Sequence, residues 1–66
     1  MEIIVNGQPR DVADGLTLAA LLAELDVTVR HVAVEVNRQL VPRGKHQDCR
    51  LAAGDRLEVV TLVGGG

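Results

Sequence analysis

The order of apolar and polar residues along the chain predicts short strands arranged around one helix. Near the start, "EIIVNGQPRDV" places two β-prone runs on either side of Asn6-Gly7. This pair is preferred in a two-residue type I′ hairpin because both turn positions need a positive φ. Pro9 has no N–H to donate, so we expect the second run to form a strand at the edge of the sheet.

The stretch "TLAALLAELD" changes the period from that of a strand to that of a helix. Leu18, Leu21, Leu22 and Leu25 fall at i, i+3, i+4 and i+7, which makes one apolar stripe. Thr17 precedes them as the expected N-cap. The β-branched "VTV" that follows indicates that the helix has ended by then.

The period of two that is typical of a strand returns in "HVAVEVN", where every second residue is valine. Val32, Val34 and Val36 share one face of the predicted strand, and Ala33 and Glu35 share the other. The next segment, "QLVP", predicts a short strand, and "RGKHQDC" is polar and is expected to be irregular.

The last apolar run, "LEVVTLV", predicts a strand from about Arg56 to Leu62. Apart from Glu58 and Thr61 it is apolar on both faces, which is typical of a central strand. Pairing this strand parallel to the first one would protect both and would leave its end projecting from the rim of the sheet.

One helix with a single apolar stripe covers one face of a small mixed sheet, so the pattern favours an α+β fold over α/β. The expected architecture is the ubiquitin-like β-grasp. We assign residues 1–63 to this single domain and residues 64–66 to a flexible C-terminal glycine tail, because glycine has no side chain to restrain it.

The sheet face opposite to the helix is expected to remain partly apolar. It would carry Ala33 and one apolar set from "IIV" and "VVTLV". An apolar surface of this kind usually marks a docking site. The alternative is that the sheet of so small a protein cannot be polar throughout.

Composition narrows the classes of function. The chain has 66 residues, no aromatic side chain and a formal net charge of −2, with its basic residues spread along the sequence. Nucleic-acid binding therefore has little support. The first apolar run is too short for a signal peptide or a membrane span, and the single cysteine suits a reducing compartment. We expect a cytoplasmic protein that binds neither nucleic acid nor membrane.

Few side chains suggest catalysis. His31 and His46 are the only histidines, and no paired carboxylate spacing implies general acid–base work. Cys49 is a conceivable nucleophile or sulfur acceptor, but a small, partly buried, reduced thiol is the favoured interpretation. We expect no metal site and no phosphate-binding loop.

The C-terminus is the remaining candidate. The carboxylate of Gly66 is ionised at neutral pH and is a poor electrophile, whereas its mixed anhydride with AMP would be reactive. Glycine leaves that carbonyl open to a sulfur or nitrogen nucleophile. Val63, Gly64 and Gly65 are the predicted partner-binding residues, and the glycines, which have no Cβ, can pass through a narrow channel where a Cβ would clash.

These residues together resemble the ThiS family, the sulfur carriers of thiamine biosynthesis. The resemblance runs over the whole chain, through "VNG", "DGLTLAALLAEL", "VAVEVNRQLVPR" and "GDRLEVVTLVGGG". The third of these blocks is the most discriminating one, because the final glycines are shared with all related carriers. A third glycine at position 64 and the lack of aromatic residues depart from the commonest pattern.

The resemblance implies that Gly66 is a substrate for other enzymes. An E1-like adenylyltransferase of the ThiF type would adenylate its carboxylate with ATP and magnesium. Sulfur supplied from cysteine by a desulfurase would then replace AMP and leave a thiocarboxylate. A thiazole synthase of the ThiG type would receive that sulfur for the thiazole ring of thiamine. The domain itself would catalyse nothing and would bind no cofactor.

Three other interpretations stay open on the sequence. The chain could carry sulfur for another pathway, as the small subunit of molybdopterin synthase does, although those chains tend to be longer and lack "VNRQLVPR". It could be a ubiquitin-like modifier whose Gly66 is conjugated to lysines. It could also be a β-grasp binding module with a passive tail.

Overall fold

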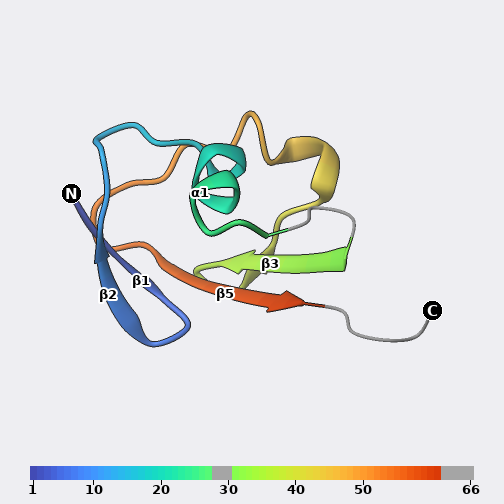
Figure 1. Cartoon of the computed structure of the whole chain (residues 1–66), viewed down its shortest axis with the longest axis horizontal. Coiled ribbons are helices and arrows are strands. Elements are labelled where there is room, and N and C mark those ends of the chain that lie inside the picture. Colours follow the sequence, from blue (N-terminus) through green and yellow to red (C-terminus); the bar gives the residue numbers. More distant parts are fainter. Residues whose placement is uncertain (28–30, 62–66) are drawn as a thin grey trace.

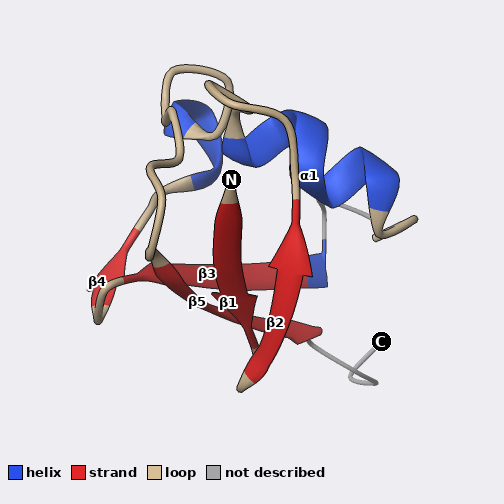
Figure 2. Cartoon of the chain, turned by 90° about the vertical axis from the view of Figure 1, so that its left-hand side faces the viewer, coloured by secondary structure: helices blue, strands red, loops and turns tan. Residues whose placement is uncertain are grey.

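The computed structural model of the chain describes residues 1–27 and 31–61 (Figure 1). Its elements are β1 (Glu2–Val5), β2 (Gln8–Asp11), α1 (Leu18–Glu24), β3 (Val32–Val36), β4 (Gln39–Leu40), the 3₁₀ helix η2 (Arg43–Lys45) and β5 (Arg56–Thr61). The strands form one sheet and α1 covers one of its faces (Figures 1 and 2).

The sheet has the order β2-β1-β5-β3-β4. β5 lies in the middle, parallel to β1 and antiparallel to β3. Of the apolar run "LEVVTLV", residues 57–61 lie in this strand, with Leu57 buried and Val60 53% exposed. The central position and the parallel pairing predicted for the last strand are therefore confirmed, as is the α+β class.

The first hairpin also has the predicted form. β1 and β2 are antiparallel, and the two turn residues between them, Asn6 and Gly7, have φ values of 51° and 82°. Both values lie in the left-handed region that a type I′ turn requires. Pro9 lies in β2, which is an edge strand, so its missing N–H removes no bond from the interior of the sheet.

The helix begins as predicted and ends slightly earlier than its apolar stripe. The Oγ1 atom of Thr17 accepts a hydrogen bond of 3.1 Å from the backbone N–H of Ala20, as an N-cap does. Leu25, the last residue of the stripe, is the C-cap. The Leu18 and Ala19 amides at the start of α1 donate to the carbonyl oxygens of Cys49 and His46, at 2.8 and 3.0 Å.

The segment expected to be irregular is more ordered than predicted. It contains η2, and His46, which follows η2, is only 3% exposed. The Nε2 atom of His46 lies 3.1 Å from the carbonyl oxygen of Val41, to which it donates. The order of this segment depends on contacts with residues distant in the sequence. The loop crosses the start of α1, where its carbonyl oxygens accept hydrogen bonds from amides that have no partner within the helix.

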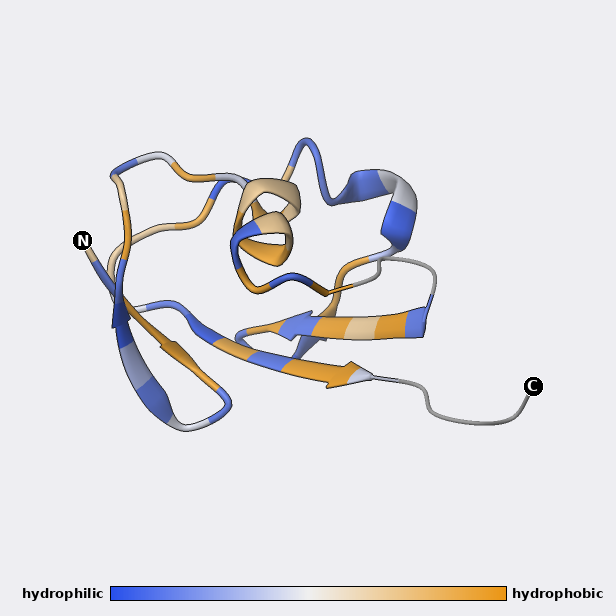
Figure 3. Cartoon of the chain, in the orientation of Figure 1, coloured by the Kyte–Doolittle hydropathy of each residue, from blue (hydrophilic) through white to orange (hydrophobic). Residues whose placement is uncertain are grey.

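The core between α1 and the sheet is built from aliphatic side chains alone. Its buried members are Ile3, Val12, Leu18, Leu21, Leu22, Val32, Val34, Leu51 and Leu57. Figure 3 shows hydrophobic residues along β1, β3 and β5 and on α1, which lies over the sheet. The leucine stripe and the valine face predicted from the sequence thus meet each other.

We expect Leu22→Ala to lower the free energy of unfolding by about 2–5 kcal/mol, because Leu22 is fully buried and its truncation leaves a cavity. That is a large part of the stability expected for a domain of this size. Urea denaturation measures the loss. Leu40→Ala is the control, since Leu40 is 65% exposed. Equal losses for the two variants would contradict the assignment of the core.

Candidate functional site

The predicted site lies just beyond the described part of the last strand. Val63, Gly64, Gly65 and Gly66 lie outside the described residues, and so does the proposed boundary between the domain and the tail. Their assigned roles stay predictions. What the structure does describe is the base of the site, which is β5 up to Thr61 and the residues that hold it.

β5 is held by backbone hydrogen bonds on both flanks. On one flank the amides of Ile4 and Asn6 donate to the carbonyl oxygens of Asp55 and Leu57, both at 2.9 Å. On the other flank β3 pairs with β5 from Leu57 to Thr61. The five residues between Thr61 and the C-terminus therefore start from a strand that lies in the middle of the sheet.

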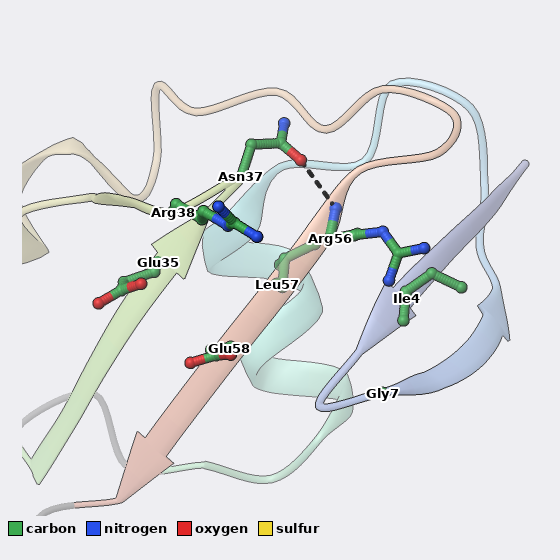
Figure 4. Close-up of a pocket in the computed structure, with 8 residues that line it drawn as sticks. All are labelled: Ile4, Gly7, Glu35, Asn37, Arg38, Arg56, Leu57 and Glu58. Carbon is green, nitrogen blue, oxygen red and sulfur yellow. Dashed lines mark hydrogen bonds between the residues drawn. The ribbon is translucent and has the colours of Figure 1, made fainter.

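Two asparagine side chains add hydrogen bonds to β5. The amide of Asn6 contacts Val59 twice, accepting from its N–H at 2.8 Å and donating to its carbonyl oxygen at 3.1 Å. The Oδ1 atom of Asn37 accepts from the N–H of Arg56 at 3.0 Å (Figure 4). The sequence indicates Asn6 only as a turn residue and gives no local signal for these bonds, which join residues 53 and 19 positions apart.

The sheet face opposite to α1 carries apolar side chains, as predicted. Ile4 and Ala33 are partly buried on it, and Val60 is 53% exposed. Leu40 belongs to the same face, because it lies opposite Glu35 in the pairing of β3 with β4. Leu40 was not predicted as part of this surface. We call Ile4, Ala33, Leu40 and Val60 the open-face patch.

Charged side chains interrupt this patch. Glu35 and Glu58 lie directly opposite each other on β3 and β5. With Arg38 and Arg56 they belong to the lining of a depression with a volume of about 380 Å³, which Figure 4 shows with α1 behind the strands. The open face is therefore mixed in character, with two carboxylates between apolar side chains. Like charges in opposite positions destabilise a sheet slightly.

The other candidate side chains have separate places. Cys49 is partly buried, as predicted, and burial raises the pKa of its thiol, with a smaller contribution from the negative charge of Asp55. His31 is exposed just before β3, and His46 is buried on the α1 side of the fold. Among the hydrogen bonds of the described residues, none joins the side chains of these three residues, and the His46 ring is bonded to the carbonyl oxygen of Val41.

Within residues 1–27 and 31–61, no three His, Cys, Asp or Glu side chains are grouped so that they could hold a metal ion. No helix there is long and apolar enough to cross a membrane.

Comparison with known proteins gives consistent results. The sequence model described as the ThiS family matches residues 3–66. The chain is 32% identical to the sulfur carrier protein ThiS of Escherichia coli over the whole length of both chains. A crystal structure of a thiamine biosynthesis protein (ThiS) from Geobacter metallireducens superposes with a TM-score of 0.87 at 33% identity, again over the whole of both chains.

A second kind of relative is much longer. The chain is 41% identical over all 66 residues to a protein of Paramagnetospirillum magneticum named thiazole synthase. It spans only 20% of the length of that relative.

The β-grasp arrangement, the structural match and the family match over nearly the whole chain lead to one assignment, which confirms the resemblance seen in the sequence. The chain belongs to the ThiS family.

Proposed function

We propose that this chain is a sulfur carrier of thiamine biosynthesis that holds the sulfur as a thiocarboxylate on Gly66. The observation that supports this most is the family match, which extends to residue 66 and so includes the terminal glycines. The described structure is compatible with that role, because β5 runs in the middle of the sheet towards the residues that would be modified.

The chemistry follows from the properties of a C-terminal carboxylate. Attack of the carboxylate on the α-phosphorus of ATP forms an acyl-adenylate and releases pyrophosphate. In the second step a persulfide on the sulfur donor attacks the acyl carbon and AMP leaves; a thiol then attacks the donor sulfur of the resulting acyl disulfide, which releases the thiocarboxylate and leaves a disulfide on the donor. Both steps belong to partner enzymes. This chain supplies the reacting group and catalyses neither step.

The partners are proposed on the same basis. Adenylation requires an enzyme of the adenylyltransferase class, with ATP and magnesium, and the sulfur is expected to come from a cysteine desulfurase. For the acceptor of the sulfur we propose a thiazole synthase. The support is that a relative with this name contains a region similar to the whole of this chain.

We further propose that partners dock on the open-face patch. Val60 lies on β5, the strand that precedes the proposed site in the chain, and it comes six residues before Gly66. A surface so close to the base of the tail would hold the carrier while the C-terminus reaches the partner's active site. When a partner covers exposed apolar side chains, the removal of their surface from water favours binding.

The first test is intact-mass spectrometry after incubation with the adenylyltransferase, ATP, magnesium and a sulfur source. The full chain should gain the mass difference between sulfur and oxygen, and fragmentation should locate it on Gly66. A chain lacking Gly65 and Gly66 is the control, which should keep its fold and gain no mass. An unchanged mass for the full chain, or isopeptide adducts on other proteins instead, would overturn the proposal.

The docking surface is tested with a matched pair of substitutions. Val60→Arg should raise the KM of adenylation by about tenfold or more, because a buried cation at an apolar contact is unfavourable. Ala23→Arg adds the same charge on the exposed side of α1 and should leave KM within about twofold of the parent. Steady-state pyrophosphate release measures both. If Val60→Arg behaves like Ala23→Arg, the open face is not the docking surface.

Cys49 provides a test of where the sulfur is held. Since burial raises the pKa of its thiol, little thiolate is present at neutral pH, and alkylation by iodoacetamide should be slow in the folded chain. Alkylation should become fast in denaturant, which serves as the control. Cys49→Ser should still form the thiocarboxylate. Loss of thiocarboxylate formation in a folded Cys49→Ser variant would show that the sulfur passes through this thiol.

A further inference from the structure

We infer that Asn6 is a positioning residue for sulfur loading, and that it acts by holding the end of β5 from which the C-terminal segment departs. The inference rests on the proposed function. It assigns to Asn6 a role in addition to the one it has in the β1–β2 turn.

The geometry shows what the Asn6 side chain replaces. Backbone pairing between β1 and β5 reaches Val5 opposite Leu57, and the chain then turns through Gly7 into β2. No β1 residue therefore lies beside Val59. The amide of Asn6 occupies that position, and it accepts from the N–H and donates to the carbonyl oxygen of Val59, as a neighbouring peptide group would.

The consequence concerns the base of the C-terminal segment. β3 pairs with Val59, Val60 and Thr61 from one flank, and the Asn6 amide holds Val59 from the other. A five-residue segment spans at most about 17 Å, so the position of Thr61 limits where Gly66 reaches. If residues 59–61 frayed, a partner would have to order them during docking, which weakens binding. The chemical step after docking would be little changed.

Asn37 offers an internal comparison for this role. It too is the first residue of a two-residue turn, with a φ of 52° against 51° for Asn6. Its side chain also accepts a hydrogen bond from β5, but at Arg56, where the strand begins. Each asparagine in addition bonds to β5 through its own backbone N–H. The two residues therefore make similar bonds to the first and second halves of one strand.

The experiment compares Asn6→Gly with Asn37→Gly in the full chain. Glycine accepts a positive φ without strain, so each substitution removes side-chain hydrogen bonds and leaves the turn intact. Adenylation kinetics with the partner adenylyltransferase should show KM raised by about tenfold for Asn6→Gly, with kcat within about twofold of the parent. Asn37→Gly should change neither constant by more than about twofold, even if it lowers stability by a similar amount.

Amide hydrogen exchange provides a readout that does not depend on a partner. The N–H of Val59 should exchange faster in Asn6→Gly than in the parent, and Asn37→Gly should leave it protected. Asn6→Asp keeps an acceptor for the Val59 N–H but loses the donor to its carbonyl oxygen, so its exchange rate and KM should be intermediate.

The outcomes separate this inference from the function on which it rests. If the parent chain is not adenylated at all, the proposed function fails. If the parent is adenylated and Asn6→Gly has an unchanged KM, or Asn37→Gly raises KM equally, the positioning role of Asn6 is wrong. A fall in kcat alone for Asn6→Gly would also overturn it.

Discussion

The structure depends on the pairing of β5 between β1 and β3. This one strand contributes Leu57 to the core, joins the N-terminal hairpin to the second half of the sheet, and leads into the C-terminal residues. Most of its contacts join residues far apart in the sequence, so they form only when the whole domain is folded. A core without aromatic side chains then suffices, because the sheet and the leucine stripe of α1 bury each other completely at Leu18, Leu21 and Leu22.

The two faces of the sheet serve different purposes in this account. The face under α1 supplies stability, and its valines and leucines have little contact with solvent. The opposite face carries apolar residues together with the Glu35–Glu58 pair, an arrangement that gains nothing for the isolated domain. Residues that contribute little to folding but remain at the surface are suited to recognition by a partner.

Much of the fold was predictable because its signals are local. Asn6-Gly7 specified the hairpin, Pro9 the edge strand, and the spacing of four leucines the helix and its buried side. The burial of His46 and the bonds from Asn6 to Val59 were not predictable, since they depend on segments brought together by the fold. For the site, the terminal glycines and the family resemblance indicated Gly66, whereas the charged part of the open face emerged only when β3 and β5 were paired.

The most direct test of the central claim follows the sulfur atom itself. The chain would be loaded with a heavy sulfur isotope, separated from its donor, and given to thiazole synthase with the other substrates of ring formation. The thiazole product should carry the heavy isotope, and Gly66 should return to a carboxylate. A product with sulfur of natural isotopic composition, formed while the label stays on the chain, would contradict that claim.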